Sequence, residues 1–312
     1  MNTVLVTGAA GFVGRHLCAA LAERGWSVVG ADVAAAPAAS APVRPLDICQ
    51  AGEVGALVRE VAPAAIVHLA AISSAAQSFA SPERALEVNG RGTLNLLEAV
   101  RHHAPGARLL AVSSADIYGP CAPGERHDEG APLNPVSPYG CAKAYADLLT
   151  GQYVASYDLD AVRVRPFSHT GPGHPPIFAL PGFAHQIAAI EAGLSKPELR
   201  VGRLDVERDF SDVRDVVACY CDILVKSDRG AVLNVCRGSA ERLDHLLEQL
   251  LALARVPIRV VTDESRLRPA DLPRLVGDPS AIHAAVGWQA EITMERTLAD
   301  LIEEARTIQG RA

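Results

Sequence analysis

The segment TVLVTGAAGFVG, residues 3–14, decides the fold of this chain. Its first four residues are β-branched or apolar, as in a buried parallel strand, and a helical pattern follows the glycines. Gly8 permits a tight turn, Gly11 lets the backbone approach a pyrophosphate, and Gly14 lets helix and strand pack closely. The free N–H groups at the start of the helix favour the same anion. The segment predicts a dinucleotide site; the alternative is a glycine turn with a purely structural role.

The rest of the first half repeats this alternation of short apolar runs and longer helical patterns. It predicts an α/β fold with a Rossmann-type doubly wound parallel sheet and right-handed crossovers. Residues 34–43 are rich in Ala and Pro and are predicted to form an exposed loop. The expected strands are 3–6, 27–31, 65–69, 108–112 and 161–164, and the expected helices are 15–24, 52–61, 82–103 and 139–157.

The rhythm breaks after Pro166, which indicates a second region. We predict a dinucleotide-binding domain over residues 1–167, to which residues 209–237 return. Residues 168–208 and 238–312 then form a smaller C-terminal α/β substrate-binding region. Ligands of open α/β sheets bind at the C-terminal ends of the strands, so these irregular segments are expected to build a lid there. Within them we predict a Gly/Pro-rich loop at 168–182 and helices at 183–193 and 241–254.

Composition excludes several classes of function. The 312 residues carry a net charge of −7 without a basic tract, so nucleic acid is not an expected partner. No apolar run approaches the roughly 20 residues of a membrane span, and no signal-peptide pattern precedes the first strand. The seven cysteines are scattered, as reduced thiols are in the cytoplasm, which is the expected location. The ten histidines form no metal-binding signature, so no metal site is predicted.

An acidic residue sets the expected cofactor. Asp32 closes the second strand, where a carboxylate hydrogen-bonds both ribose hydroxyls and repels a 2′-phosphate. NADH is therefore favoured over NADPH, although the nearby Arg15 leaves use of NADP open. The ends of the next two segments suit the adenine edge and the floor beneath the cofactor; these residues are Asp47, Ile48, Leu69, Ala70 and Ala71.

Tyr139 and Lys143 are four residues apart on a predicted helix and hence on one face. A phenol has a pKa of about 10 and is a poor proton shuttle at neutral pH. A cation about 4 Å away would lower that pKa by about three units, so we expect Lys143 to tune Tyr139 for general acid–base catalysis. Ser113 and Ser114 end the fourth strand, where a hydroxyl would polarise a carbonyl oxygen. The alternative is a solvated Tyr/Lys pair beside strand-end serines.

Several motifs together resemble the extended short-chain dehydrogenases/reductases that act on nucleotide sugars, nearly from end to end. These are TGAAGFVG, Asp32, HLAA at 68–71, Asn89, VSSADIYG at 112–119, the Tyr139/Lys143 pair and RPFSHTGPG at 165–173. Within the group, RPFSHTGPG and residues 183–193, 201–216, 266–282 and 287–298 are most similar to GDP-4-keto-6-deoxymannose reductases, and next to GDP-mannose 4,6-dehydratases. The resemblance implies reduction of a C4 ketone to GDP-rhamnose or its C4 epimer. Tyr139 would protonate the forming alkoxide, while Ser114 and Lys143 orient and polarise.

The resemblance also assigns the remaining site residues. Arg208 and Arg268 would hold the nucleotide diphosphate, which suits guanidinium groups, and Asp271 would face the ribose. The alternative for each arginine is a surface ion pair. Ser168 stands where the family has Asn and is shorter by an atom. The full predicted substrate site is Ser114, Asp116, Ser168, His169, Gln186, Arg208, Arg268 and Asp271, and the cofactor site also includes Phe12, Val13, Asn89, Ser113, Tyr139, Lys143 and Pro166.

The segment Ser114-Ala115-Asp116 favours reduction over elimination. Dehydratases carry an acid/base trio here, but Ala115 cannot donate a proton and Asp116 is one methylene shorter than the dehydratase glutamate. The alternatives are a nucleotide-sugar dehydratase or epimerase, another substrate in the same fold, and a non-catalytic NAD(P)-sensing protein. The resemblance further implies a homodimer that packs through residues 92–103 and 139–157.

Overall fold

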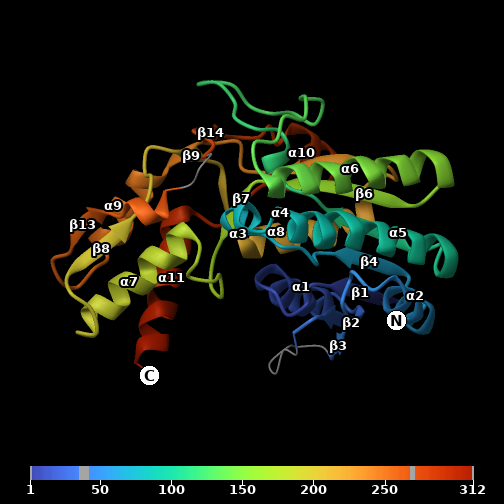
Figure 1. Cartoon of the computed structure of the whole chain (residues 1–312), viewed down its shortest axis with the longest axis horizontal. Helices are drawn as coiled ribbons and strands as arrows, with labels where there is room; N and C mark the ends of the chain where they lie inside the picture. The colour runs from blue at the N-terminus through green and yellow to red at the C-terminus, as the bar shows by residue number, and fades with distance from the viewer. Residues whose placement is uncertain (1, 35–41, 268–270, 311–312) are drawn as a thin grey trace.

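The structure, a computed structural model, describes residues 2–34, 42–267 and 271–310. Its centre is a seven-stranded parallel sheet in the order β11-β6-β5-β4-β1-β2-β3 (Figure 1). This confirms the predicted Rossmann-type α/β fold. The strands are β1 (Thr3–Thr7), β2 (Ser27–Asp32), β3 (Val43–Pro45), β4 (Ala65–His68), β5 (Arg108–Val112), β6 (Ala161–Pro166) and β11 (Val232–Val235).

Helices cover both faces of this sheet. Neighbouring strand residues bury their side chains on opposite faces, as Val4 and Leu5 do, and so the strands read as continuous apolar runs. The face of Val4 packs against α1 (Phe12–Glu23), α8 (Val213–Lys226) and α10 (Ser280–Val286). The face of Leu5 packs against α2 (Ala51–Val61), α5 (Gly92–His103) and α6 (Pro138–Tyr157).

Two elements of this domain differ from prediction. The edge strand β3 begins at Val43, the last residue of the predicted loop; its residues are exposed or half-buried, and Pro45 suits an edge. The predicted helix 82–103 is divided into α4 (Pro82–Leu86), a π-helical turn η1 (Glu87–Arg91) and α5. A π turn adds one residue to a single helical turn and so shifts the phase of the helix only locally. The apolar pattern of residues 82–103 therefore does not mark it.

The second region has its own apolar core. It joins α7 (Ala179–Glu191), α9 (Leu243–Ala252) and α11 (Met294–Gln309) with β8 (Glu198–Val201). Strand β13 (Arg259–Thr262) pairs with β8 and is exposed or half-buried. The predicted loop 168–182 instead contains β7 (Ser168–Thr170), which pairs in parallel with β10 (Phe210–Asp212). Three short strands complete the region in the order β12 (Glu241–Arg242), β9 (Glu207–Arg208) and β14 (Arg274–Leu275). Helix α10 lies within the predicted substrate region, but its Ile282 packs on the dinucleotide-binding domain.

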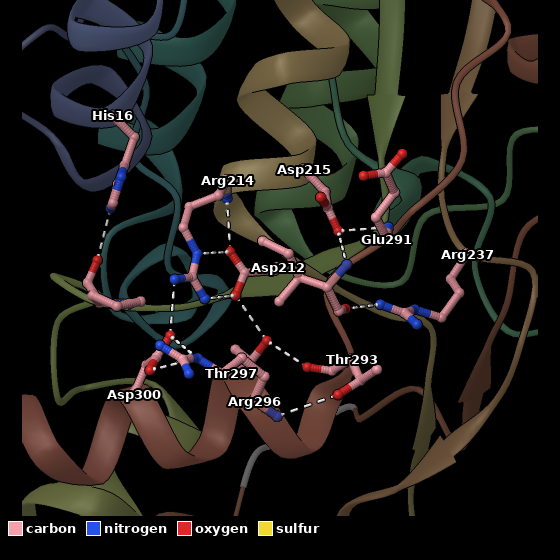
Figure 2. Close-up of polar contacts among 12 residues, drawn as sticks. His16, Asp212, Arg214, Asp215, Arg237, Glu291, Thr293, Arg296, Thr297 and Asp300 are labelled. Atoms are coloured by element: carbon pink, nitrogen blue, oxygen red, sulfur yellow. Dashed lines mark hydrogen bonds and ion pairs between the residues drawn. The ribbon is translucent and has the colours of Figure 1, made fainter.

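A polar joint links the last helix, α11, to the start of α8 (Figure 2). Asp212 caps α8 and accepts hydrogen bonds from the Arg214 guanidinium and from Thr297 Oγ1 of α11, both at 2.7 Å. Arg214 also pairs with Asp300 of α11 at 2.8 Å. Asp215 accepts bonds from two backbone N–H groups just before α11, at 2.8 and 3.0 Å. The joint sets the position of the second region beside the ends of the strands. Within the described part of the chain, no helix is long and apolar enough to cross a membrane.

Candidate active site

A cavity of about 1080 Å³ lies at the C-terminal ends of the central strands, between the two regions. The ends of β1, β2, β4, β5 and β6 form its floor, and residues of the second region form the opposite wall. This is the position predicted for the ligand of an open α/β sheet. Nearly all the predicted site residues that the structure describes line this cavity.

The glycine loop forms a cradle at one end. Gly8 has a positive φ of 75°, and a Cβ there would come within 2.7 Å of the Ala70 backbone nitrogen. A Cβ on Gly14 would lie 2.2 Å from the Gly8 carbonyl oxygen. The loop therefore packs too closely for side chains at these two positions. Gly11 precedes α1 without a side-chain cap, so the first N–H groups of the helix are available to an anion. The cradle fits the diphosphate of a dinucleotide.

The acidic residue at the end of β2 faces this cradle. Asp32 lines the cavity and accepts hydrogen bonds from the backbone nitrogens of Ala10 at 3.0 Å and Ala34 at 3.2 Å. It thus braces the glycine loop, a role that the sequence did not indicate. Asp47 and Ile48 also line the cavity, and the Cys49 backbone N–H lowers the pKa of Asp47.

At two residues the structure differs from what the sequence indicated. Arg84 lines the cavity beside Asp47 and pairs with Glu87 at 2.7 Å; nothing in the sequence singled it out. Asn89, predicted to bind the cofactor, is buried in the π turn η1 and is not among the residues that line the cavity. Its amide clamps the backbone of Ile72, accepting from N at 2.8 Å and donating to O at 3.0 Å. Because Ile72 lines the cavity, Asn89 shapes the cavity indirectly.

The predicted catalytic residues meet on one wall. Tyr139 lies in the first turn of α6, where its backbone nitrogen donates to Ser78 Oγ at 3.0 Å. Lys143 follows one turn later, is only 7% exposed, and donates from Nζ to the Val112 carbonyl at 2.8 Å. Ser114 caps a short turn after β5 and donates to Asp116 Oδ2 at 3.2 Å. A substrate atom in the cavity can therefore meet the phenol and the serine hydroxyl together.

In the structure, Lys143 is not among the groups that shift the pKa of Tyr139. Burial raises the pKa of Tyr139 well above 10, the Asp116 carboxylate raises it further, and the Ser114 hydrogen bond only partly opposes them. The Lys143 ammonium is directed to the Val112 carbonyl instead. Burial lowers the pKa of Lys143 to about 8 against the opposing charge of Asp147. Tyr139 is consequently a protonated phenol at neutral pH.

The predicted substrate residues that the structure describes line the cavity, and several already have hydrogen-bond or ion-pair partners. Arg208 Nη2 pairs with Asp271 Oδ1 at 2.9 Å, so these two residues form one unit. The Gln186 amide clamps the Arg200 backbone in β8, accepting from its N–H at 2.9 Å. Ser168 and His169 lie in β7, and the His169 ring bonds the Phe167 carbonyl at 3.0 Å. Arg268 lies outside the described residues.

Residues 171–175 cover the cradle and belong to the segments expected to build a lid, but the sequence did not indicate the contacts that hold them. The His174 ring stacks on Phe12 at 4.3 Å and on Phe178 at 4.4 Å, and burial lowers the pKa of His174 to about 3. From α1, His16 bonds the Pro172 carbonyl at 2.8 Å (Figure 2), and Arg15 donates to the Gly173 carbonyl. Glu304 of α11 accepts from the Gly173 nitrogen at 2.7 Å. Helices from both ends of the chain thus hold this cover.

The part of the chain that the structure describes contains no group of three or more His, Cys, Asp or Glu residues suited to a metal.

Comparison with known proteins agrees with this geometry. A family model described as GDP-mannose 4,6 dehydratase matches residues 5–301. The GDP-6-deoxy-D-mannose reductase of Pseudomonas aeruginosa is 36% identical over 304 residues, which cover 96% of each chain. The structure of RMD from Pseudomonas aeruginosa complexed with NADPH superposes with a TM-score of 0.85 at 33% identity, covering 99% of this chain and 100% of that one. The UDP-glucose 4-epimerase of Thermus thermophilus in complex with NAD gives 0.88 at 28% identity, covering 97% and 99%. The chain belongs to the extended short-chain dehydrogenases/reductases, within the family of NAD-dependent epimerases and dehydratases that modify nucleotide sugars.

Proposed function

We propose that this protein reduces the C4 ketone of GDP-4-keto-6-deoxy-mannose, or of a close nucleotide-linked keto-sugar, with NAD(P)H. The product would be GDP-rhamnose or its C4 epimer. The observation that carries the proposal is the shared cavity, with a dinucleotide cradle at one end and the Tyr139, Ser114 and Lys143 side chains on its wall. The similarity to the Pseudomonas aeruginosa reductase supports the choice of substrate.

The residues of the chain supply the acid side of this reaction. A nicotinamide dinucleotide bound in the cradle would supply the hydride. Tyr139 lines the cavity and is protonated at neutral pH, and it can give that proton to the C4 oxygen because the forming alkoxide is a stronger base than a phenolate. Ser114 orients and polarises the same oxygen, and the Lys143 cation on the same wall favours the developing negative charge. Arg208, paired with Asp271, would hold the nucleotide, and the resemblance gives Arg268 the same role.

Ala115 and Asp116 separate this proposal from its main rival, a nucleotide-sugar 4,6-dehydratase. Elimination needs a base that reaches the C5 proton, and Ala115 offers no polar group. One observation supports the dehydratase: the Asp116 carboxylate accepts a hydrogen bond from Ser114 and is close enough to raise the pKa of Tyr139. The aspartate is nevertheless a methylene shorter than the glutamate expected of a dehydratase, which favours net reduction.

The test is a pair of assays with the purified protein. GDP-4-keto-6-deoxy-mannose with NADH or NADPH should cause a loss of absorbance at 340 nm, and GDP-mannose should be left unchanged. Consumption of GDP-mannose without net cofactor change would establish the dehydratase instead. Binding of both ligands without turnover would identify a sensor.

Asp32 is expected to make NADH the preferred cofactor, because its carboxylate repels a 2′-phosphate. Asp32→Asn removes the charge but keeps an oxygen that can accept a hydrogen bond from the Ala10 nitrogen, which lies 3.0 Å from the Asp32 carboxylate in the unaltered protein. The ratio of the NADPH to the NADH dissociation constant should fall by about tenfold, which corresponds to about 1.4 kcal/mol. Fluorescence titration with each cofactor measures the ratio. Tighter binding of NADPH than NADH by the unaltered protein would contradict this preference.

We also propose a homodimer that packs through α6. Tyr145 and Leu148 on α6 and Leu86 on α4 expose apolar surface, and the Leu148 side chain is 59% exposed. Leu148→Asp should convert a dimer into a monomer at micromolar concentration, measured by light scattering, because a charge would be buried in the interface. Leu194→Asp, at a comparably exposed leucine of the second region, is the control and should leave the mass unchanged. A monomeric mass for the unaltered protein would refute the dimer.

A further inference from the structure

Tyr220 of α8 is a buried phenol whose hydroxyl has no partner. The residue is 1% exposed, and its Oη makes no hydrogen bond with any residue that the structure describes. Buried tyrosine hydroxyls usually find a partner, since an unsatisfied polar atom carries a free-energy cost. Five other buried side-chain atoms share this condition among the described residues, but none of them belongs to a residue that lines the cavity. Tyr220 does line it.

The phenol lies on the opposite side of the reaction centre from Tyr139. Helix α8 packs against α1 and β5 on one face of the sheet, and Tyr139 enters from α6 on the other. Tyr220 and Tyr139 both line the cavity. A charge on Tyr139 would raise the pKa of Tyr220, as expected of two phenols that border the same part of the cavity. In the proposed function this part holds the nicotinamide half of the cofactor.

We propose that Tyr220 donates a hydrogen bond to the nicotinamide half of the bound dinucleotide, where the carboxamide is the polar group of the ring. Burial keeps the phenol protonated, which leaves it a donor. The inference rests on the proposed function, because it takes a nicotinamide cofactor as the ligand. It adds a cofactor-binding residue from a helix that the glycine motif and the catalytic motif do not include.

Tyr220→Phe tests the inference without removing the ring. The variant should raise the dissociation constant for NADH by about tenfold, as expected for one lost hydrogen bond in a dry site. It should leave the affinity for ADP-ribose unchanged, because that ligand lacks the nicotinamide. The thermal midpoint of the cofactor-free protein should be equal or higher, because the unpartnered hydroxyl is gone. The upward shift of that midpoint by NADH should become smaller.

Tyr118→Phe is the matched control. Tyr118 is equally buried, but its hydroxyl bonds Asn234 and Arg165, both at 2.8 Å, and the residue does not line the cavity. It should lower the thermal midpoint and leave the NADH affinity unchanged. An unchanged NADH affinity in Tyr220→Phe would overturn the inference, as would an equal loss for NADH and ADP-ribose, which would place the contact at the diphosphate. Failure of the unaltered protein to bind any nicotinamide dinucleotide would instead overturn the proposed function itself.

Discussion

Replacing Tyr139 with phenylalanine is expected to lower kcat/KM for the keto-sugar by about 10²–10⁴-fold, the range for loss of a general acid. The phenol lies on the cavity wall beside Ser114 and stays protonated at neutral pH, because burial and Asp116 both raise its pKa. Phenylalanine keeps the ring and the packing of α6 but removes the proton donor. NADH affinity should change little, and the loss should appear in kcat when the sugar and the cofactor are saturating.

Tyr145→Phe, six residues further along α6, is the control for this variant. Its ring is exposed on the surface of the helix, and it does not line the cavity, so turnover should be unaffected. Steady-state kinetics at 340 nm compare the two variants. Full turnover by Tyr139→Phe would show that the proton comes from elsewhere and would remove the basis of the proposed mechanism.

Truncating Asp147 to alanine is expected to lower the free energy of unfolding by about 3–5 kcal/mol. This carboxylate lies inside the protein, 2% exposed, and accepts hydrogen bonds from Arg165 at 2.8 and 3.0 Å and from Arg163 at 3.2 Å. Without it, the guanidinium of Arg165 remains buried with only neutral partners, the Tyr118 hydroxyl and the Glu129 carbonyl. An uncompensated buried charge accounts for the size of the effect.

Urea unfolding measures this loss against a surface pair. Arg44 and Glu60 form an ion pair at 3.0 Å on the protein surface, so Glu60→Ala should change the free energy of unfolding far less than Asp147→Ala does. A loss in Asp147→Ala no larger than that of Glu60→Ala would contradict the expected burial of the arginine charge.

The parallel sheet was predictable because its central strands are buried on both faces and separated by helical patterns. The runs that contain Leu5 and Ile66 have no polar interruption, so they indicate parallel strands without further context. The strand β3 and the pair β7/β10 escaped prediction, because three residues carry too little periodicity and their pairing is decided by segments far away in sequence. The π turn around Asn89 escaped for a related reason, since it alters the phase of a helix but not its composition.

The candidate site likewise has features that the sequence predicts and features that it does not. Strand ends meet at one edge of a parallel sheet, so the topology alone brings the glycine loop, Asp32 and Ser114 to a common cavity. Side-chain partnerships depend on contacts across the fold. The pairing of Arg208 with Asp271 and the unpartnered hydroxyl of Tyr220 leave no local mark in the sequence. The pKa of Tyr139 is a case of this kind, because it is raised by burial and by the Asp116 carboxylate, neither of which the Tyr139/Lys143 spacing indicates.

The cover formed by residues 171–175 is anchored by residues that are synthesised at very different times. One of its anchors, His16, leaves the ribosome early, whereas Glu304 follows almost three hundred residues later. A nascent chain can assemble the glycine cradle and most of the sheet while the Gly173 N–H still lacks its carboxylate partner. The cover can therefore be fastened only after residue 304 has been synthesised, later than the glycine cradle that it closes.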